Sequence, residues 1–293
     1  MKRLFLIANR LPLQVNKENG KTELVPVSDG FDSGLKRFYE SFDIKWIGRA
    51  GVNIDEISEA EKINIDNNFR KDNCIPVYLD QNLRNEFLEG FCDNTLWPLF
   101  NYFTQITKYN SLQWEAYKKV NQLFADIVTK YIKDDDIIWI HDYHLMLLPQ
   151  LIREKFPNVS IGYFQHIPFP SFEVFRLLPW RMEILDGLLN ADLVGFHTYD
   201  YQRHFLSCVR RLLGLETFFN RIRLDERVVK VDAFPKGIDF DFFNNKAKEL
   251  SKRSGDDESV IQKELNEYLR RGKDRKIILS KLLYVYQSCQ HHL

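Results

Sequence analysis

The sequence feature that most constrains the fold is the segment from Ile137 to Phe175, which predicts a β-strand, a helix and a second β-strand. One apolar run, Ile137 to Ile140, ends just before Asp142, and a second, Val159 to Phe164, ends just before His166. Short apolar runs that flank a helical segment are typical of buried parallel strands. In open parallel sheets, ligands bind beyond the carboxyl ends of the strands. We therefore expect Asp142 and His166 to be neighbours in a binding crevice.

The same alternation of strands and helices continues along the chain. Further strands are predicted at Arg3 to Ala8, Ile44 to Gly48, Cys74 to Leu79, Ala191 to Phe196 and Val228 to Phe234, and helices at Ser111 to Tyr131 with Ser111 as N-cap, Phe172 to Leu189 and Tyr199 to Leu213. This order predicts an α/β fold with a Rossmann-like, doubly wound, mostly parallel sheet. Arg10 and His197 also follow predicted strands, so the expected crevice collects Arg10, Asp142, His166 and His197.

Charge and cysteine content exclude several classes of function. Lys plus Arg and Asp plus Glu both number 41, so the chain lacks the basic balance of a general nucleic-acid or anionic-membrane binder. No apolar run approaches the roughly 20 residues that span a bilayer. The four cysteines form no CxxC pair, which favours reduced thiols in the cytoplasm. The acidic run Asp134 to Asp136 and the terminal Cys289, His291 and His292 lack the geometry of a metal site, so we expect no metal.

Each candidate site residue has a structural and a functional interpretation. Arg10 either pairs with a surface carboxylate or clamps a phosphate, and Asp142 either caps a helix or binds sugar hydroxyls. His166 is either a core histidine or a site residue held rigid by the prolines that follow it. Trp97 is either core or a platform for a sugar ring, and Gly30 either forms a plain turn or lets the backbone approach an anion.

Six segments of the chain together resemble the trehalose-6-phosphate synthases, a retaining glycosyltransferase family of GT-B fold. The segments are Asn9 to Pro12, Leu96 to Phe100, Trp114 to Phe124, Trp139 to Pro149, His166 to Arg176 and Asp192 to Gly214, and the resemblance extends from the first strand to about Ser280. It implies the N-terminal, acceptor-binding domain of that fold. Members transfer glucose from UDP-glucose to glucose 6-phosphate, and the resemblance implies no metal and no cofactor besides the donor substrate.

The resemblance also implies a role for each candidate residue. Arg10 corresponds to the residue that holds the acceptor phosphate, and Trp97 and Asp142 correspond to contacts of the acceptor sugar. His166 is similar to the histidine beside the transferred glucosyl unit, so we assign catalytic roles to His166 and Asp142. Gly30 corresponds to the glycine whose backbone approaches the donor phosphates.

This sequence departs from the family pattern at several site positions. Asp29 precedes Gly30 where the family has paired glycines, Arg49 replaces the second tryptophan of a WxGWxG pattern, and Leu88 replaces a tyrosine that contacts the acceptor. Lys236 replaces an isoleucine. After Ser280 the resemblance stops, before the Arg and Lys that grip the donor diphosphate in the family.

These observations predict three parts and two alternative functions. We expect an acceptor-binding domain at residues 1–240, a charged connector with the first strand of an incomplete donor domain at 241–280, and an unrelated tail at 281–293. The chain is expected to be a truncated synthase that is inactive alone and uses UDP-glucose only when a separate donor-domain polypeptide supplies the other half. The alternative is a non-catalytic remnant or sugar-phosphate-binding module, and loss of a packed domain favours homo-oligomers.

Overall fold

The computed structural model describes residues 2–18, 21–26 and 42–235, together with residues 237, 240, 241, 244, 245 and 248. Residues 1–238 form one compact unit, and residues 239–293 make up a second. The predicted loop at Ser28 to Gly30, Lys236 and the strand expected near Ser280 lie outside the described residues. The three predicted domain boundaries stay predictions.

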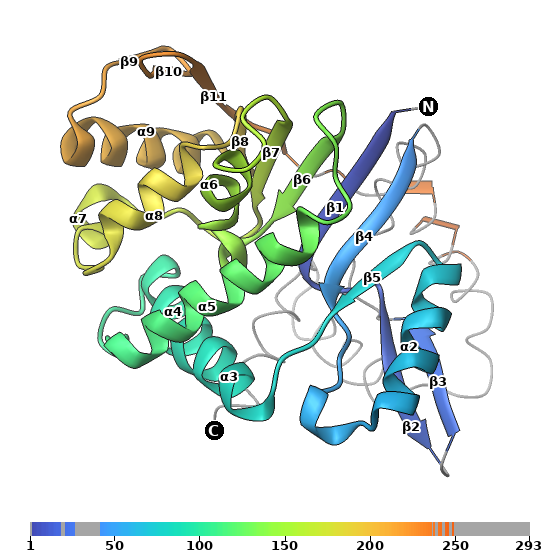
Figure 1. Cartoon of the computed structure of the whole chain (residues 1–293). Coiled ribbons are helices and arrows are strands. Elements are labelled where there is room, and N and C mark those ends of the chain that lie inside the picture. The colour runs from blue at the N-terminus through green and yellow to red at the C-terminus, as the bar shows by residue number, and fades with distance from the viewer. Residues whose placement is uncertain are drawn as a thin grey trace. The chain divides into compact units, whose positions relative to one another are not determined.

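One mostly parallel sheet of nine strands organises the described part of the chain (Figure 1). Its order is β5-β4-β1-β6-β7-β8-β11-β10-β9. The strands are β1 (Arg3–Arg10), β4 (Asp43–Arg49), β5 (Cys74–Val77), β6 (Ile137–His141), β7 (Ser160–Gln165), β8 (Leu193–Phe196), β9 (Thr217–Phe218), β10 (Arg221–Arg223) and β11 (Val228–Ala233). Among these strands, only the pairs β9–β10 and β10–β11 are antiparallel. The α/β fold with a doubly wound, mostly parallel sheet is thus confirmed.

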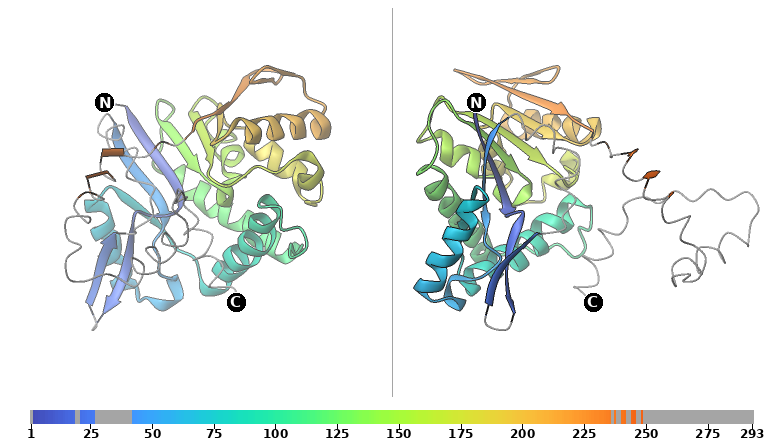
Figure 2. Two further views of the ribbon diagram at one scale, coloured as in Figure 1. Left: turned by 180° about the vertical axis from the view of Figure 1, so that it is seen from behind. Right: turned by 90° about the vertical axis from the view of Figure 1, so that its right-hand side faces the viewer.

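The position of β1 in the sheet follows from its sequence. Leu4, Phe5, Leu6 and Ile7 are all buried, so both faces of β1 are covered, as in a central parallel strand. It pairs with β4 on one side and β6 on the other, with Ile7 opposite both Ile47 and Ile140. The views in Figure 2 show these strands side by side from two further directions.

Helices connect the strands and cover the sheet. They are η1 (Ile54–Glu56), α2 (Glu59–Lys71), α3 (Gln81–Asn85), η2 (Glu86–Leu96), α4 (Trp97–Phe100), α5 (Ser111–Val128), η3 (Tyr143–Leu145), α6 (Leu148–Arg153), α7 (Phe172–Phe175), α8 (Arg181–Leu188) and α9 (Tyr199–Leu213). Helix α5 packs on η2 and α6, and α6 packs on α8. Helix α2 lies beside a small hairpin of β2 (Leu13–Glu18) and β3 (Lys21–Pro26), at the lower right of Figure 1.

Two helix predictions were wrong in detail. The helix expected from Phe172 to Leu189 is two short helices, because Pro179 lies between them and disfavours helical backbone at the residue before it. Helix α5 does begin at Ser111, but its N-cap is Asn110, whose side chain accepts a hydrogen bond from the Leu112 N–H at 2.9 Å.

Three features of the fold have no counterpart in the sequence prediction. The sequence prediction has no hairpin of β2 and β3, although Asn19-Gly20 stands between the two strands and is a common hairpin turn. Strands β9 and β10 are too short to show periodicity. The eleven-residue segment η2 is a π-helix that continues α3 into α4. π-Helical segments are rare and often occur at functional sites.

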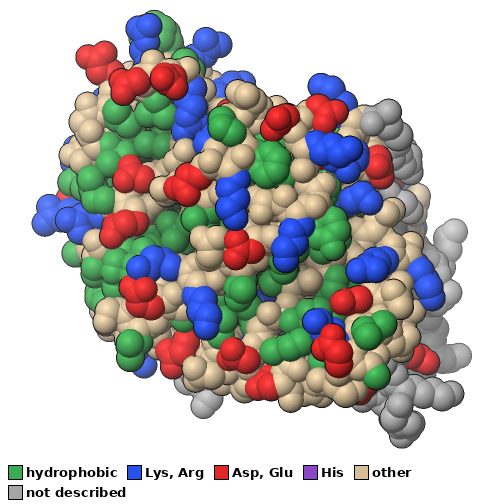
Figure 3. Space-filling view, in the orientation of Figure 1, with side chains coloured by type: hydrophobic (Ala, Val, Ile, Leu, Met, Phe, Trp, Pro, Cys, Tyr) green, Lys and Arg blue, Asp and Glu red, His purple; other side chains and the backbone are tan. Residues whose placement is uncertain are grey.

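The surface carries mixed charges. On the face in Figure 3, Lys and Arg side chains are interspersed with Asp and Glu, in keeping with a net charge of zero for the whole chain. No helix among the described residues is long and apolar enough to cross a membrane.

Candidate functional site

The strand order places a topological switch point between β1 and β6. Strands β4 and β5 extend the sheet on one side of β1, and β6, β7 and β8 extend it on the other. This order reverses the direction of winding between β1 and β6, and doubly wound sheets bind ligands at such a point, beyond the carboxyl ends of the strands. Arg10 is the last residue of β1, and Asp142 follows the last residue of β6. The two candidates therefore lie on either side of the switch point.

Asp142 and His166 are neighbours, as the sequence predicted. The backbone N–H of His166 donates to Asp142 Oδ1 at 3.2 Å, and the backbone N–H of Asp142 donates to the Phe164 carbonyl at 2.7 Å. Burial raises the pKa of the Asp142 carboxyl to about 6, although hydrogen bonds from the backbone N–H groups of Tyr143, His166 and Ile167 oppose the shift. A carboxyl with such a pKa exchanges protons near neutrality.

The backbone at Asp142 has an unusual conformation. Its φ is 70° and its ψ is 167°, a region that is almost restricted to glycine because a Cβ atom is crowded there. Such strain persists only where the surrounding structure holds it. Asp142 is thus held in a costly conformation at the carboxyl end of β6.

Helix α5 holds the turn that carries Asp142. The Tyr117 hydroxyl donates to the Tyr143 carbonyl at 2.8 Å and accepts from the Met146 N–H at 3.0 Å. The Asn121 amide donates to the His144 carbonyl at 3.2 Å and accepts from the Leu147 N–H at 3.3 Å. Tyr117 and Asn121 are fully buried, so these bonds are shielded from water and fix the turn.

Three histidines form a cluster after β6, β7 and β8. His141 Nδ1 and His166 Nε2 are 3.1 Å apart, at hydrogen-bonding distance. The ring centroid of His166 lies 5.3 Å from that of His197, which also packs on Phe164 at 4.9 Å. Burial, and then the neighbouring His166, lower the pKa of His141, so the His141 ring is neutral and orients His166. The sequence predicted His166 and His197 at this edge but gave no role to His141.

A second cation, Arg49, accompanies Arg10. The two arginines are register partners on β1 and β4, and the Leu11 N–H donates to the Arg49 carbonyl at 3.3 Å. The Arg10 side chain is exposed, whereas that of Arg49 is only 8% exposed and donates from Nε to Asn9 Oδ1 at 2.9 Å. Burial, followed by repulsion from Arg10 and Arg84, lowers the pKa of Arg49 to about 9.

Trp97 and Leu88 lie on the long helical segment that packs against α5. Trp97 begins α4, is partly buried, and stacks on Phe103 with ring centroids 5.8 Å apart and an interplanar angle of 10°. Leu88 lies on η2 and is 6% exposed. No hydrogen bond or ring contact among the described residues joins Trp97 to Arg10 or Asp142. Gly30 lies outside the described residues, so its predicted role stays a prediction.

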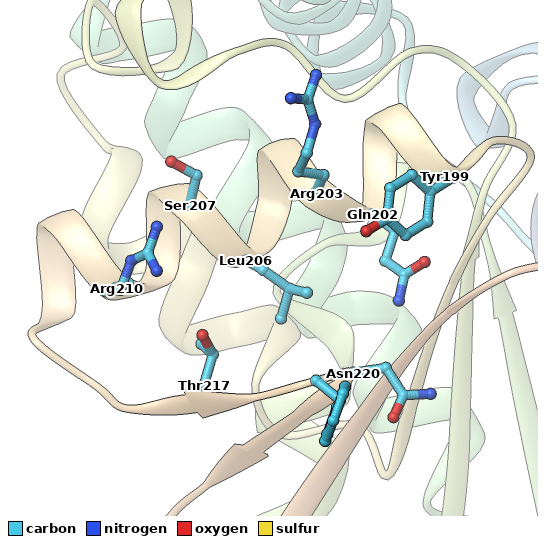
Figure 4. Close-up of a pocket in the computed structure, with 9 residues that line it drawn as sticks. Tyr199, Gln202, Arg203, Leu206, Ser207, Arg210, Thr217 and Asn220 are labelled. Carbon is cyan, nitrogen blue, oxygen red and sulfur yellow. The ribbon is translucent and has the colours of Figure 1, made fainter.

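A separate hollow of about 530 Å³ lies between α9 and the β9–β10 hairpin (Figure 4). Arg210 and Ser207 line it from α9, and Thr217 faces them from β9. None of the residues predicted from the sequence lines this hollow. Within the described part of the chain, no group of three or more His, Cys, Asp or Glu residues is placed to hold a metal ion.

The strand order and the residues at its switch point define a Rossmann-like domain of the GT-B class, and comparisons with known proteins agree. The profile of glycosyltransferase family 20 matches residues 2–281. The chain is 43% identical over 259 residues to an alpha,alpha-trehalose-phosphate synthase (UDP-forming) of Emericella nidulans, covering 86% of this chain and 51% of that one. The chain belongs to glycosyltransferase family 20, and it spans about half the length of the curated relatives it matches.

Two solved structures are similar as well. An E. coli trehalose-6-phosphate protein bound with UDP-2-fluoro glucose superposes with a TM-score of 0.69 at 26% identity, over 92% of this chain and 54% of that one. The N-terminal domain of a Candida albicans trehalose-6-phosphate phosphatase gives a TM-score of 0.71 at 30% identity, over the same 92% of this chain and 54% of that chain.

Proposed function

We propose that this chain forms the acceptor side of a UDP-forming trehalose-phosphate synthase and binds glucose 6-phosphate in the crevice between β1 and β6. The observation that carries the proposal is the placement of Arg10 and Asp142 on either side of the switch point. A guanidinium there suits a phosphate, and a carboxylate suits sugar hydroxyls. Similarity to trehalose-phosphate synthases over most of this chain supports the choice of sugar phosphate.

Each residue has a proposed role in this complex. Arg10 holds the acceptor phosphate, Asp142 and Trp97 contact the acceptor sugar, and His166 lies beside the glucosyl unit that is transferred. The Gly30 backbone contacts the donor phosphates. The reaction is glucosyl transfer from UDP-glucose with retention, in which the residues orient two sugars and the departing phosphate takes the acceptor proton. We propose that no metal or other cofactor takes part.

The cell compartment proposed for this activity is the cytoplasm. Cys74, Cys92 and Cys208 are buried free thiols, and burial raises the pKa of all three. Thiols kept protonated and unpaired suit a reducing compartment.

Calorimetry with the 293-residue chain tests acceptor binding. We expect saturable heat with glucose 6-phosphate and much weaker heat with glucose, because the phosphate supplies the ion pair to Arg10. Asp142→Asn is expected to weaken binding by about 10-fold, the usual effect of losing a hydrogen bond to a charged group. Absence of heat at millimolar glucose 6-phosphate, with the protein folded by circular dichroism, would contradict the proposal.

A second candidate is a sugar-phosphate-binding module that does not transfer glucose. Arg49 and Leu88 favour it, because Arg49 stands where the family pattern has a tryptophan and Leu88 where it has a tyrosine that contacts the acceptor. The chain is incubated with UDP-glucose and glucose 6-phosphate, and trehalose 6-phosphate is measured. We expect binding without efficient transfer by this chain alone, with recovery if a polypeptide carrying the donor domain is added. Enzyme-like turnover by the chain alone would reject both the module and the need for a partner.

A further inference from the structure

Arg49 presents an unusual electrostatic problem. Its side chain is almost completely buried, and among the described residues it makes one hydrogen bond, from Nε to Asn9 Oδ1. Among the described residues, no carboxylate lies within salt-bridge distance of either Arg49 or Arg10, whereas nearby Arg84 is paired with Glu89 at 3.2 Å. A buried cation without a counter-ion costs stability. Within the described part of the chain, this positive charge is therefore not paired with a carboxylate at salt-bridge distance.

A second cation adds to this charge. Arg10 is the register partner of Arg49 on the neighbouring strand, so the two arginines stand side by side at the carboxyl ends of β1 and β4, whose ribbons are adjacent in Figure 1. The turn after β6 faces these strand ends, because β1 contacts η3. His144 in that turn responds to both arginines: burial first, and then Arg49 and Arg10, lower its pKa to about 3. Both arginines thus act on a side chain of the turn that follows Asp142.

The turn also offers a neutral polar atom. His144 Nδ1 is buried and has no hydrogen-bond partner among the described residues. Buried polar atoms in folded proteins are normally satisfied by protein or ligand. His144 Nδ1 thus marks an unsatisfied polar position in the turn beside the two arginines, and two guanidiniums suit an oxyanion with several oxygens.

We propose that Arg49 is a second phosphate-binding residue that acts with Arg10, so that the crevice selects a dianionic phosphate ester over the unphosphorylated sugar. This inference takes the identity of the sugar from the proposed function, whereas the binding of an anion by Arg49 is argued from the structure alone. Asn9 holds the Arg49 guanidinium through Nε, which leaves its two terminal nitrogens to donate in parallel to phosphate oxygens. Arg49 stands where the family pattern has a tryptophan, so this chain replaces an aromatic contact by a charge.

The test compares Arg49→Met with wild type and with a matched control, Arg210→Met. Arg210 is an exposed arginine of the other hollow and has no carboxylate partner among the described residues (Figure 4). Affinities for glucose 6-phosphate, inorganic phosphate and glucose are measured by calorimetry, and thermal unfolding is followed without ligand. We expect Arg49→Met to weaken the binding of both phosphate compounds by about 10- to 100-fold. The affinity for glucose should stay unchanged, and the melting temperature of the protein should rise. Arg210→Met is expected to change no affinity by more than about twofold.

The outcomes separate this inference from the proposed function. The inference is overturned if wild type and Arg49→Met bind inorganic phosphate with equal affinity. It is also overturned if the variant melts at a lower temperature while its affinity is unchanged. In both cases Arg10 alone holds the acceptor phosphate. Binding of inorganic phosphate that depends on Arg49, without binding of glucose 6-phosphate, upholds the inference and rejects the proposed sugar. Loss of phosphate binding in Arg210→Met alone overturns it as well, because the anion then binds in the hollow beside α9.

Discussion

At the scale of single residues, Asp142 combines a strained backbone with a displaced pKa. Both follow from its place after β6, where its N–H is tied to Phe164 and its carboxylate to the His166 backbone. The sequence predicted that Asp142 and His166 are neighbours, because each follows the end of a predicted strand. It did not predict the strain, because φ is set by tertiary contacts and not by the Asp side chain.

Replacing Asp142 by glycine is expected to stabilise the protein while abolishing sugar binding. Glycine adopts a φ of 70° without a clash, so the change removes about 1–3 kcal/mol of strain but also the carboxylate. The free energy of unfolding in urea and the affinity for glucose 6-phosphate are measured side by side. Asp142→Ala is the control, since it loses the carboxylate and keeps the strain. If the Asp142→Gly variant proves no more stable than the Asp142→Ala variant, the backbone at this position is not strained.

The pKa of Asp142 predicts a specific dependence of stability on pH. Its value is about 6 in the folded protein, against about 3.9 for an unfolded aspartate. Between about pH 4 and pH 6 the folded form keeps a proton that the unfolded form has lost, so stability contributed by this group falls as pH rises. The difference in unfolding free energy between wild type and Asp142→Asn is expected to decrease by about 1–3 kcal/mol from pH 4 to pH 7. A constant difference across this range would show that the carboxyl titrates normally.

At the scale of elements, the close approach of β4 to the end of β1 positions the two arginines. A Cβ atom on Gly48 would lie 2.8 Å from the backbone carbon of Arg10 and from the backbone nitrogen of Leu11. Only glycine therefore fits at this point of β4. Gly162 on β7 differs, because its Cβ would meet its nearest atoms at 3.8 Å.

We expect Gly48→Ala to cost about 1–3 kcal/mol of stability and to weaken phosphate binding, because β1 must shift where it carries Arg10. Gly162→Ala, a matched change in the same sheet, is expected to be near neutral. Urea unfolding gives the stabilities, and calorimetry with glucose 6-phosphate gives the affinities. Equal costs for the two substitutions would contradict the proposed close approach.

Periodicity predicted the long elements well and the short ones poorly. The buried runs of β1 and β6 and the helical spacing of α5 and α9 are strong local signals, and all four elements form. The hairpin of β2 and β3 and the break at Pro179 carry local signals, Asn19-Gly20 between the two strands and the proline itself, which a search for apolar periodicity does not weigh. The π-helix η2 has no such local signal. The burial of Arg49 has none either, because an arginine after an apolar run is expected at the surface until its neighbours are known.

At the scale of the whole molecule, residues 1–238 form a compact unit whose buried apolar side chains make one large cluster and one smaller cluster. We expect a chain that ends at residue 238 to unfold cooperatively in urea, with the same midpoint as the 293-residue protein. Glucose 6-phosphate at about 100 times its Kd is expected to stabilise both by about 2.7 kcal/mol. Loss of the cooperative transition in the shorter chain alone would show that its core needs residues beyond 238.

The switch point between β1 and β6 has a consequence for how this domain can change. Arg10, Arg49 and Asp142 all lie at strand ends, whereas the apolar residues of β1 and β6 lie within the sheet. Ligand preference and fold stability are therefore encoded by largely separate positions. A substitution such as arginine for tryptophan after Gly48 can change the charge at the strand ends without changing the sheet. The ligand preference of the domain can therefore evolve while its fold is kept.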